Sequence, residues 1–146
     1  MPVVLQHCDE LPVTSVEVAS LWAAAAKARG HGDDQVTVRC VDGPTMQELN
    51  SQYRHQNKPT NVLTFSYPSS DFGQAPEHDV ALCLPVAQQE AAVGEVPLKD
   101  YAAQLLAHAF LHACGLDHER SAAEAEEMEQ AERAVLAQCG FAAHAS

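Results

Sequence analysis

Three histidines stand at offsets of four and ten in the run His108-Ala-Phe-Leu-His112-Ala-Cys-Gly115-Leu-Asp-His118. Residues 98–113 contain no Pro or Gly and are rich in Ala and Leu, which predicts a helix. On a helix His108 and His112 share one face, with Cβ atoms about 5–6 Å apart. Gly115 is a residue type that ends helices, so His118 can return from outside the helix. The run predicts a three-nitrogen metal site with a fourth position open, as in catalytic zinc sites.

Two other interpretations of this run stay open. The chain has eight histidines, and these three could be unrelated, although both offsets and the glycine must then coincide by accident. Cys114 lies inside the run and a thiolate can bind zinc, yet three imidazoles already suffice for a catalytic site.

The rest of the chain predicts an α+β fold: a small mixed sheet of about four strands packed by helices. Apolar and β-branched patterns place strands at residues 3–5, 36–41, 61–66 and 79–84. Helical spacing and capping residues place helices at residues 15–29, 45–52, 85–93, 98–113 and 122–139. Residues 68–76 are rich in turn formers and predict a mobile loop, and residues 141–146 predict a disordered tail.

Length and composition predict one cytoplasmic domain over residues 1–146. The chain has 47% apolar residues, enough for a core, but no run of about 20 apolar residues and no basic leader before an apolar stretch. Membrane spanning and secretion are therefore not expected. The five cysteines are scattered without a CxxC pair, which is typical of reduced thiols in a cytosolic protein.

The formal charge of −12 weighs against nucleic-acid binding, because phosphate contacts normally leave a basic footprint. The acidic residues, however, are concentrated in residues 119–132. Arg54 and Lys58 lie in a different stretch that is nearly free of acids, so a local cationic patch is compatible with the sequence. A divalent metal would add positive charge of its own.

The histidine run follows the HExxHxxGxxH pattern of metzincin peptidases except at one position, where Ala109 replaces the glutamate. That glutamate is the general base in those enzymes. The resemblance implies that the metal-binding helix is kept, whereas peptide hydrolysis is not expected.

Three separated segments resemble the YbeY family, the bacterial rRNA maturation endoribonucleases: LNSQYRHQNKPTNVLTFSYP from Leu49, HDVALCL from His78 and HAFLHACGLDH from His108. The resemblance covers most of the chain, from Leu49 to Gly140. It implies a four-stranded sheet packed by helices and one zinc per chain, bound by His108, His112 and His118. It also implies cleavage of single-stranded RNA during 16S rRNA 3′-end maturation and ribosome quality control.

The chain departs from that family at Ala109 and His78, where glycine is usual, and at Leu116, where tyrosine is usual. Ala109 favours the helix, whereas Leu116 removes a phenol near the site. His78 precedes Asp79 on a strand that resembles the one lining the family's site. Three interpretations of His78 stay open: a solvated histidine at a strand start, a phosphate contact, or an extra metal contact.

Phosphodiester cleavage needs positive charge on the phosphoryl oxygens, and the resemblance places Arg54 at the family's functionally important arginine. An arginine presents a fork that matches two phosphate oxygens, and Lys58 is expected to add a second substrate contact. Arg54 could also be a surface ion-pair partner. Asp79 and Asp117 are both candidates for the base, although Asp117 could instead be a turn residue or a partner of His118.

The function predicted on these grounds is a zinc-dependent endoribonuclease specific for single strands, which acts on 16S rRNA with the small ribosomal subunit and its assembly proteins. DNA and membranes are not expected partners. Two alternatives remain: a metallopeptidase of metzincin-like geometry, and a noncatalytic ribosome-assembly factor with a structural zinc. Structural zinc sites normally close all four positions with protein ligands, and a fourth ligand is not evident here.

Overall fold

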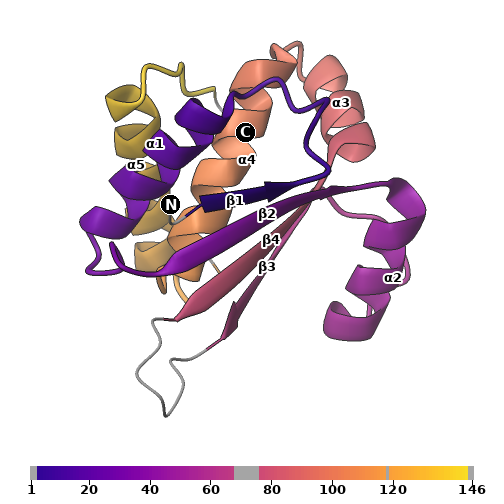
Figure 1. Ribbon diagram of the computed structural model, residues 1–146, viewed down its shortest axis with the longest axis horizontal. Coiled ribbons are helices and arrows are strands. Elements are labelled where there is room, and N and C mark those ends of the chain that lie inside the picture. Colours follow the sequence, from indigo (N-terminus) through magenta and orange to yellow (C-terminus); the bar gives the residue numbers. More distant parts are fainter. Residues whose placement is uncertain (1–2, 68–75, 118, 145–146) are drawn as a thin grey trace.

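The computed structural model describes residues 3–67, 76–117 and 119–144 (Figure 1). Its four strands are β1 (Val3–Gln6), β2 (Gln35–Val41), β3 (Val62–Tyr67) and β4 (Glu77–Cys83). They form one mixed sheet in the order β1-β2-β4-β3. β1, β2 and β4 are parallel, and β3 pairs antiparallel to β4 at the edge. The predicted α+β class with a four-stranded mixed sheet is confirmed.

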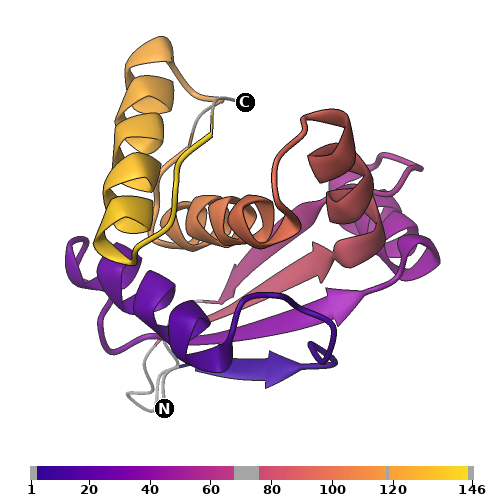
Figure 2. The same cartoon turned by 90° about the horizontal axis from the view of Figure 1, so that it is seen from above.

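The helices are α1 (Ser15–Lys27), α2 (Gly43–Arg54), α3 (Leu84–Val93), α4 (Leu98–Ala113) and α5 (Ala122–Gln138). α1, α4 and α5 lie over one face of the sheet, and α2 lies on the other side (Figures 1 and 2). No helix within the described ranges is both long and apolar enough to cross a membrane.

Local capping explains where several helices begin. Thr14 accepts a hydrogen bond from the Glu17 amide and the Glu17 carboxylate accepts one from the Thr14 amide, which makes the capping box that starts α1. The second helix starts earlier than the predicted residue 45, because Asp42 caps it by accepting from the Thr45 amide at 2.8 Å. Pro44 then fits the first turn, where no backbone donor is needed.

Alternation along the strands divides the sheet into two different faces. Val36, Val38, Val80 and Leu82 point to the main core with α1 and α4, where Trp22 and Phe110 are fully buried. The intervening residues, such as Leu63 and Ala81, point to the other face. There they pack with Met46 of α2 in a second, smaller cluster.

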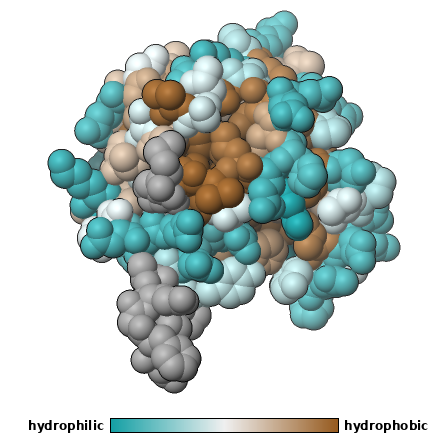
Figure 3. Space-filling model, in the orientation of Figure 1, coloured by the Kyte–Doolittle hydropathy of each residue, from teal (hydrophilic) through white to brown (hydrophobic). Residues whose placement is uncertain are grey.

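β1 forms one edge of the sheet, and the end of the chain packs back onto the core. β1 is an edge strand with Val4 38% exposed, and the face seen in Figure 3 is apolar in the region of β1. Beyond α5, where a disordered tail was predicted, Phe141 packs against the core and His144 Nε2 lies 3.0 Å from Asp100 Oδ2. Residues 145–146 of that tail lie outside the described residues, as does most of the predicted loop at 68–76.

Candidate active site

α4 carries the first two histidines of the run near its C-terminal end. His108 is half-buried and its Nδ1 hydrogen-bonds the Glu132 carboxylate of α5, whereas His112 is exposed. α4 ends at Ala113, and Gly115 follows with φ +100°, a conformation that glycine adopts without strain. His118, the third predicted ligand, lies outside the described residues.

The segment after α4 is held by its own polar contacts. Asp117 Oδ1 accepts a hydrogen bond from the Glu119 amide at 2.8 Å, and Arg120 donates to the Gly115 carbonyl at 2.9 Å. Arg120 Nε also lies 2.9 Å from Glu124 Oε2. These contacts give Asp117 a role in the turn, and they keep the chain on both sides of residue 118 in a defined path.

Arg54 lies beside this segment although it is distant in sequence. It is the last residue of α2, and its Nη2 is 3.6 Å from Glu119 Oε1 in an exposed ion pair. His55 follows in the left-handed conformation with φ 57°, which ends the helix. The buried Asn50 amide then donates to the Lys58 carbonyl at 2.9 Å and holds the loop that carries exposed Lys58. The fold thus brings Arg54 next to the neighbour of His118.

Asp79, the other candidate base, does not lie on the side of the sheet that α4 covers. On β4 it points to the face that α2 flanks, whereas its neighbours His78 and Val80 point to the α1 and α4 side. The pKa of Tyr67 is raised by partial burial of its phenol and by the charge of Asp79, which also accepts a hydrogen bond from that phenol. The structure does not place Asp79 on the face where α4 packs.

His78 is buried in the core, with 3% of its surface exposed, so the interpretation of a solvated histidine is wrong. Its position on β4 turns it toward α1, where its ring centroid lies 5.6 Å from that of Trp22. Nδ1 lies 2.8 Å from Ser66 Oγ on the paired strand β3, and Nε2 lies 2.7 Å from Asp34 Oδ2. Both ring nitrogens therefore have partners inside the protein.

The same Asp34 oxygen lies 2.7 Å from His31 Nδ1, so one carboxylate joins two imidazoles. Burial raises the pKa of Asp34, but the hydrogen bonds and charges of His78 and His31 outweigh it, and the net shift is downward. The donor atoms of His31, Asp34 and His78 all lie within 4.8 Å of one another, so this histidine–aspartate group could hold a metal ion. Two imidazoles and a carboxylate suit zinc and several other transition metals.

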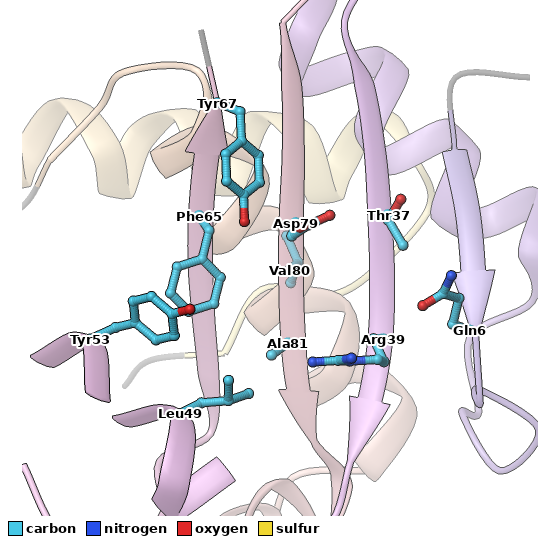
Figure 4. Close-up of a pocket in the computed structure, with 10 residues that line it drawn as sticks. All are labelled: Gln6, Thr37, Arg39, Leu49, Tyr53, Phe65, Tyr67, Asp79, Val80 and Ala81. Atoms are coloured by element: carbon cyan, nitrogen blue, oxygen red, sulfur yellow. The ribbon is translucent and has the colours of Figure 1, made fainter. Parts of the chain in front are cut away.

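A groove of about 320 Å³ opens on the α2-flanked face of the sheet (Figure 4). Tyr53 and Leu49 of α2 form one side, and Phe65 and Tyr67 of β3 lie next to them. Arg39 extends from β2 across β4 toward Ala81 on the floor. The groove is therefore lined by aromatic rings on one side and polar groups on the other.

Comparison with known proteins identifies the family. A family model described as Endoribonuclease YbeY matches residues 9–140. This chain belongs to the YbeY endoribonuclease family. Its curated relatives include Endoribonuclease YbeY of Paracidovorax citrulli, 46% identical over 110 residues that cover 75% of this chain and 70% of that protein. The enzyme of the same name from Delftia acidovorans is 44% identical over the same shares.

The fold is also shared with a solved structure. A solution structure of a Thermotoga maritima protein aligns with a TM-score of 0.65 at 22% identity, covering 94% of this chain and 88% of that one. The family model and the curated relatives confirm the predicted family resemblance, and this structure confirms the shared fold. Membership of the YbeY family makes the chain a hydrolase that acts on RNA phosphodiester bonds.

Sequence reasoning about this YbeY chain missed His31 and Asp34. The two residues are three apart in a turn before β2, and nothing in their spacing resembles a helical or strand-borne metal motif. Only the pairing of β2 with β4 brings Asp34 to His78. The one signal in the sequence was Asp34 itself, a polar residue immediately before the buried strand β2.

Proposed function

We propose that this YbeY-family protein is a zinc-dependent endoribonuclease that cleaves single-stranded RNA during 16S rRNA 3′-end maturation and ribosome quality control. It would act in the cytoplasm with the small ribosomal subunit and its assembly proteins. Family membership supports the RNA-cleaving activity. The observation that carries the proposal is the ion pair of Arg54 with Glu119, which puts a guanidinium beside the segment that follows the histidine helix.

His108, His112 and His118 would hold one zinc ion per chain. The Glu132 carboxylate fits this role, because metal-binding histidines commonly donate their second ring N–H to a carboxylate, which sets the ring orientation. With Nδ1 engaged by Glu132, a metal would be bound through Nε2 of His108. When bound, the zinc supplies positive charge and lowers the pKa of water.

Arg54 would bind the scissile phosphate. Its guanidinium can donate two parallel hydrogen bonds to phosphoryl oxygens and stabilise the charge that grows on them in the transition state. The ion pair with Glu119 does not prevent this, because exposed pairs of this kind contribute only about 0–1 kcal/mol and exchange readily. Lys58, exposed in the loop after α2, would add a second cationic contact to the RNA backbone.

Asp117 and Asp79 both remain candidates for the base. Asp117 lies in the same segment as Arg54's partner, with one carboxylate oxygen on the Glu119 amide and the other 3.7 Å from Arg120 Nε. Asp79 opens to the groove on the other face of the sheet. The position of the metzincin glutamate offers no base, because Ala109 is packed in the core.

Single-turnover cleavage of an end-labelled single-stranded RNA tests the proposal. Arg54→Ala is expected to lower the cleavage rate on the order of 10²-fold while zinc content stays unchanged. Arg54→Lys should recover only part of the rate, because an ammonium lacks the bidentate fork. Arg133→Ala is the matched control, since Arg133 is also an exposed arginine in an ion pair, with Glu129 of its own helix α5.

Three further arms separate the alternatives. A chelator should abolish RNA cleavage, duplex RNA and single-stranded DNA should stay intact, and a peptide library should yield no products. A wild-type cleavage rate in zinc-loaded Arg54→Ala would remove Arg54 from the mechanism. Chelator-sensitive peptide cleavage without RNA cleavage would instead favour the metallopeptidase.

A further inference from the structure

The groove on the α2-flanked face gathers aromatic side chains that the proposed cleavage chemistry does not use. Tyr53 and Phe65 pack edge to face, with ring centroids 4.8 Å apart. Tyr53 is 61% exposed and Tyr67 is 50% exposed, which is unusual for residues of this size in a small domain. Two of the three tyrosines in the chain are thus held at one groove with much of their surface open to water.

Polar groups line the other side of this groove. Arg39, Gln6 and Thr37 come from β2 and β1, and Asp79 from β4 (Figure 4). Arg39 is exposed, and within the described ranges no carboxylate oxygen lies within 4 Å of its guanidinium. A planar cation with hydrogen-bond donors, facing a row of aromatic rings, suits a flat, polar, aromatic ligand.

One residue that lines the groove is the chain neighbour of Arg54. Tyr53 directly precedes Arg54 at the end of α2, and Arg54 contacts Glu119 beside the histidine segment. A single strand held by Arg54 therefore has Tyr53, at the aromatic side of the groove, as the next residue along the chain. Its bases are unpaired and offer the faces that a duplex hides.

We propose that this groove is a base-binding subsite, in which Tyr53, Phe65 and Tyr67 stack against an unpaired base of the RNA substrate and Arg39 hydrogen-bonds it. The inference rests on the proposed cleavage of single-stranded RNA. It explains how a chain of charge −12 can hold RNA, because stacking needs no excess of cationic residues. It also explains selection of single strands, since a paired base cannot enter the groove.

Binding of two fluorescently labelled oligomers tests the subsite. One is an oligouridylate, and the other has the same sugar–phosphate backbone without bases. The wild-type protein should bind the oligouridylate on the order of 10-fold more tightly or better, the typical contribution of one stacked base. Tyr67→Ala and Tyr53→Ala should lose most of this preference, whereas Tyr67→Phe should keep it because the ring remains.

Val16→Ala is the matched control, because Val16 is 74% exposed on α1, and α1 packs on the opposite face of the sheet from the groove. Thermal unfolding of each variant checks that the fold is kept. Salt gives a second signature: the loss caused by Tyr67→Ala should be the same at low and high salt, whereas the loss caused by Arg54→Ala should shrink as salt rises.

Equal wild-type affinity for the two oligomers would overturn the subsite, and so would unchanged binding and KM in both alanine variants. Binding of small ribosomal subunits that depends on Tyr53 and Tyr67, with oligouridylate binding unaffected, would also overturn it and assign the groove to a protein partner. These outcomes leave RNA cleavage by the wild type intact. Failure of the proposed function is recognised separately, as absence of any chelator-sensitive RNA cleavage.

Discussion

His78 and His112 belong to two histidine groups with opposite surroundings. His78 sits between β4 and α1 with both ring nitrogens hydrogen-bonded to Ser66 and Asp34. His112 is exposed at the end of α4, one helical turn after His108. The buried histidine–aspartate group is a complete hydrogen-bond network as it stands, so it can stabilise the fold without a ligand. The helix-borne pair lies where an ion and a substrate can reach it. Under the proposed function, the same residue type would serve stability in one place and metal binding in the other.

The largest effect expected concerns stability. His78→Ala removes a ring from the core and leaves the buried Asp34 carboxylate with one partner fewer, so the free energy of unfolding should fall by about 3–5 kcal/mol. Urea unfolding at neutral pH measures this. His144→Ala is the control, because His144 pairs with Asp100 near the surface and its loss should cost about 1 kcal/mol or less. Equal stability of the two variants would contradict a stabilising role for the buried group.

Zinc binding should depend on the histidines of α4 and not on the buried histidine–aspartate group. His112→Ala should weaken zinc binding by more than about 100-fold, because loss of a ligand exceeds the 10–100-fold cost of losing a ligand's hydrogen-bond partner. His31→Ala should leave zinc binding unchanged. Competition with a chromophoric chelator, together with elemental analysis, measures both. Zinc retained by His112→Ala but lost by His31→Ala would assign the ion to His31, Asp34 and His78 instead.

A smaller change is expected at Glu132, which contacts His108 from α5. Glu132→Ala should weaken zinc binding by about 10–100-fold, and Glu132→Gln by less, since the amide oxygen can still accept the ring N–H. The neighbouring Glu129→Ala is the control, because Glu129 is exposed and pairs with Arg133. If Glu132→Ala and Glu129→Ala bind zinc equally well, Glu132 is not a positioning residue for the metal site.

The smallest effect is a pH dependence of the buried group. The pKa of Asp34 in the folded protein is below its usual value. The stabilisation from its ionised form is therefore fully present above the unfolded pKa of about 3.9. It is lost as pH falls through the lower folded pKa. The stability difference between wild type and Asp34→Asn should therefore shrink as the pH falls below about 4. A difference that grows as the pH falls from about 4 to about 3 would show that the folded pKa is raised.

The sequence predicted the helix-borne pair because its evidence is local. Spacing of four, a stretch without Pro or Gly and a following glycine are all visible in one segment, and α4 has the predicted bounds. The start of α2 was predicted two residues late because the capping box at Thr45 seemed sufficient, whereas Asp42 and Pro44 extend the helix. That error is local and small.

The buried group could not be predicted in the same way. It needs Ser66 opposite His78 in the antiparallel pair and Asp34 at the start of β2, next to β4 in the sheet. Strand order and register are long-range properties that hydrophobic patterns in short strands leave open. The groove was missed for a related reason, because Tyr53 reaches Phe65 and Tyr67 only once α2 packs against that face of the sheet.

Trp22 is the only tryptophan of the chain, and its ring packs against that of His78. The indole is therefore a natural fluorophore placed at one of the two histidine groups. A protonated imidazole or a bound paramagnetic ion next to an indole quenches its emission, so the intrinsic fluorescence should report what happens at His78. Excitation at the indole band, during a titration with acid or with Cu²⁺, would follow the buried group optically and without a label.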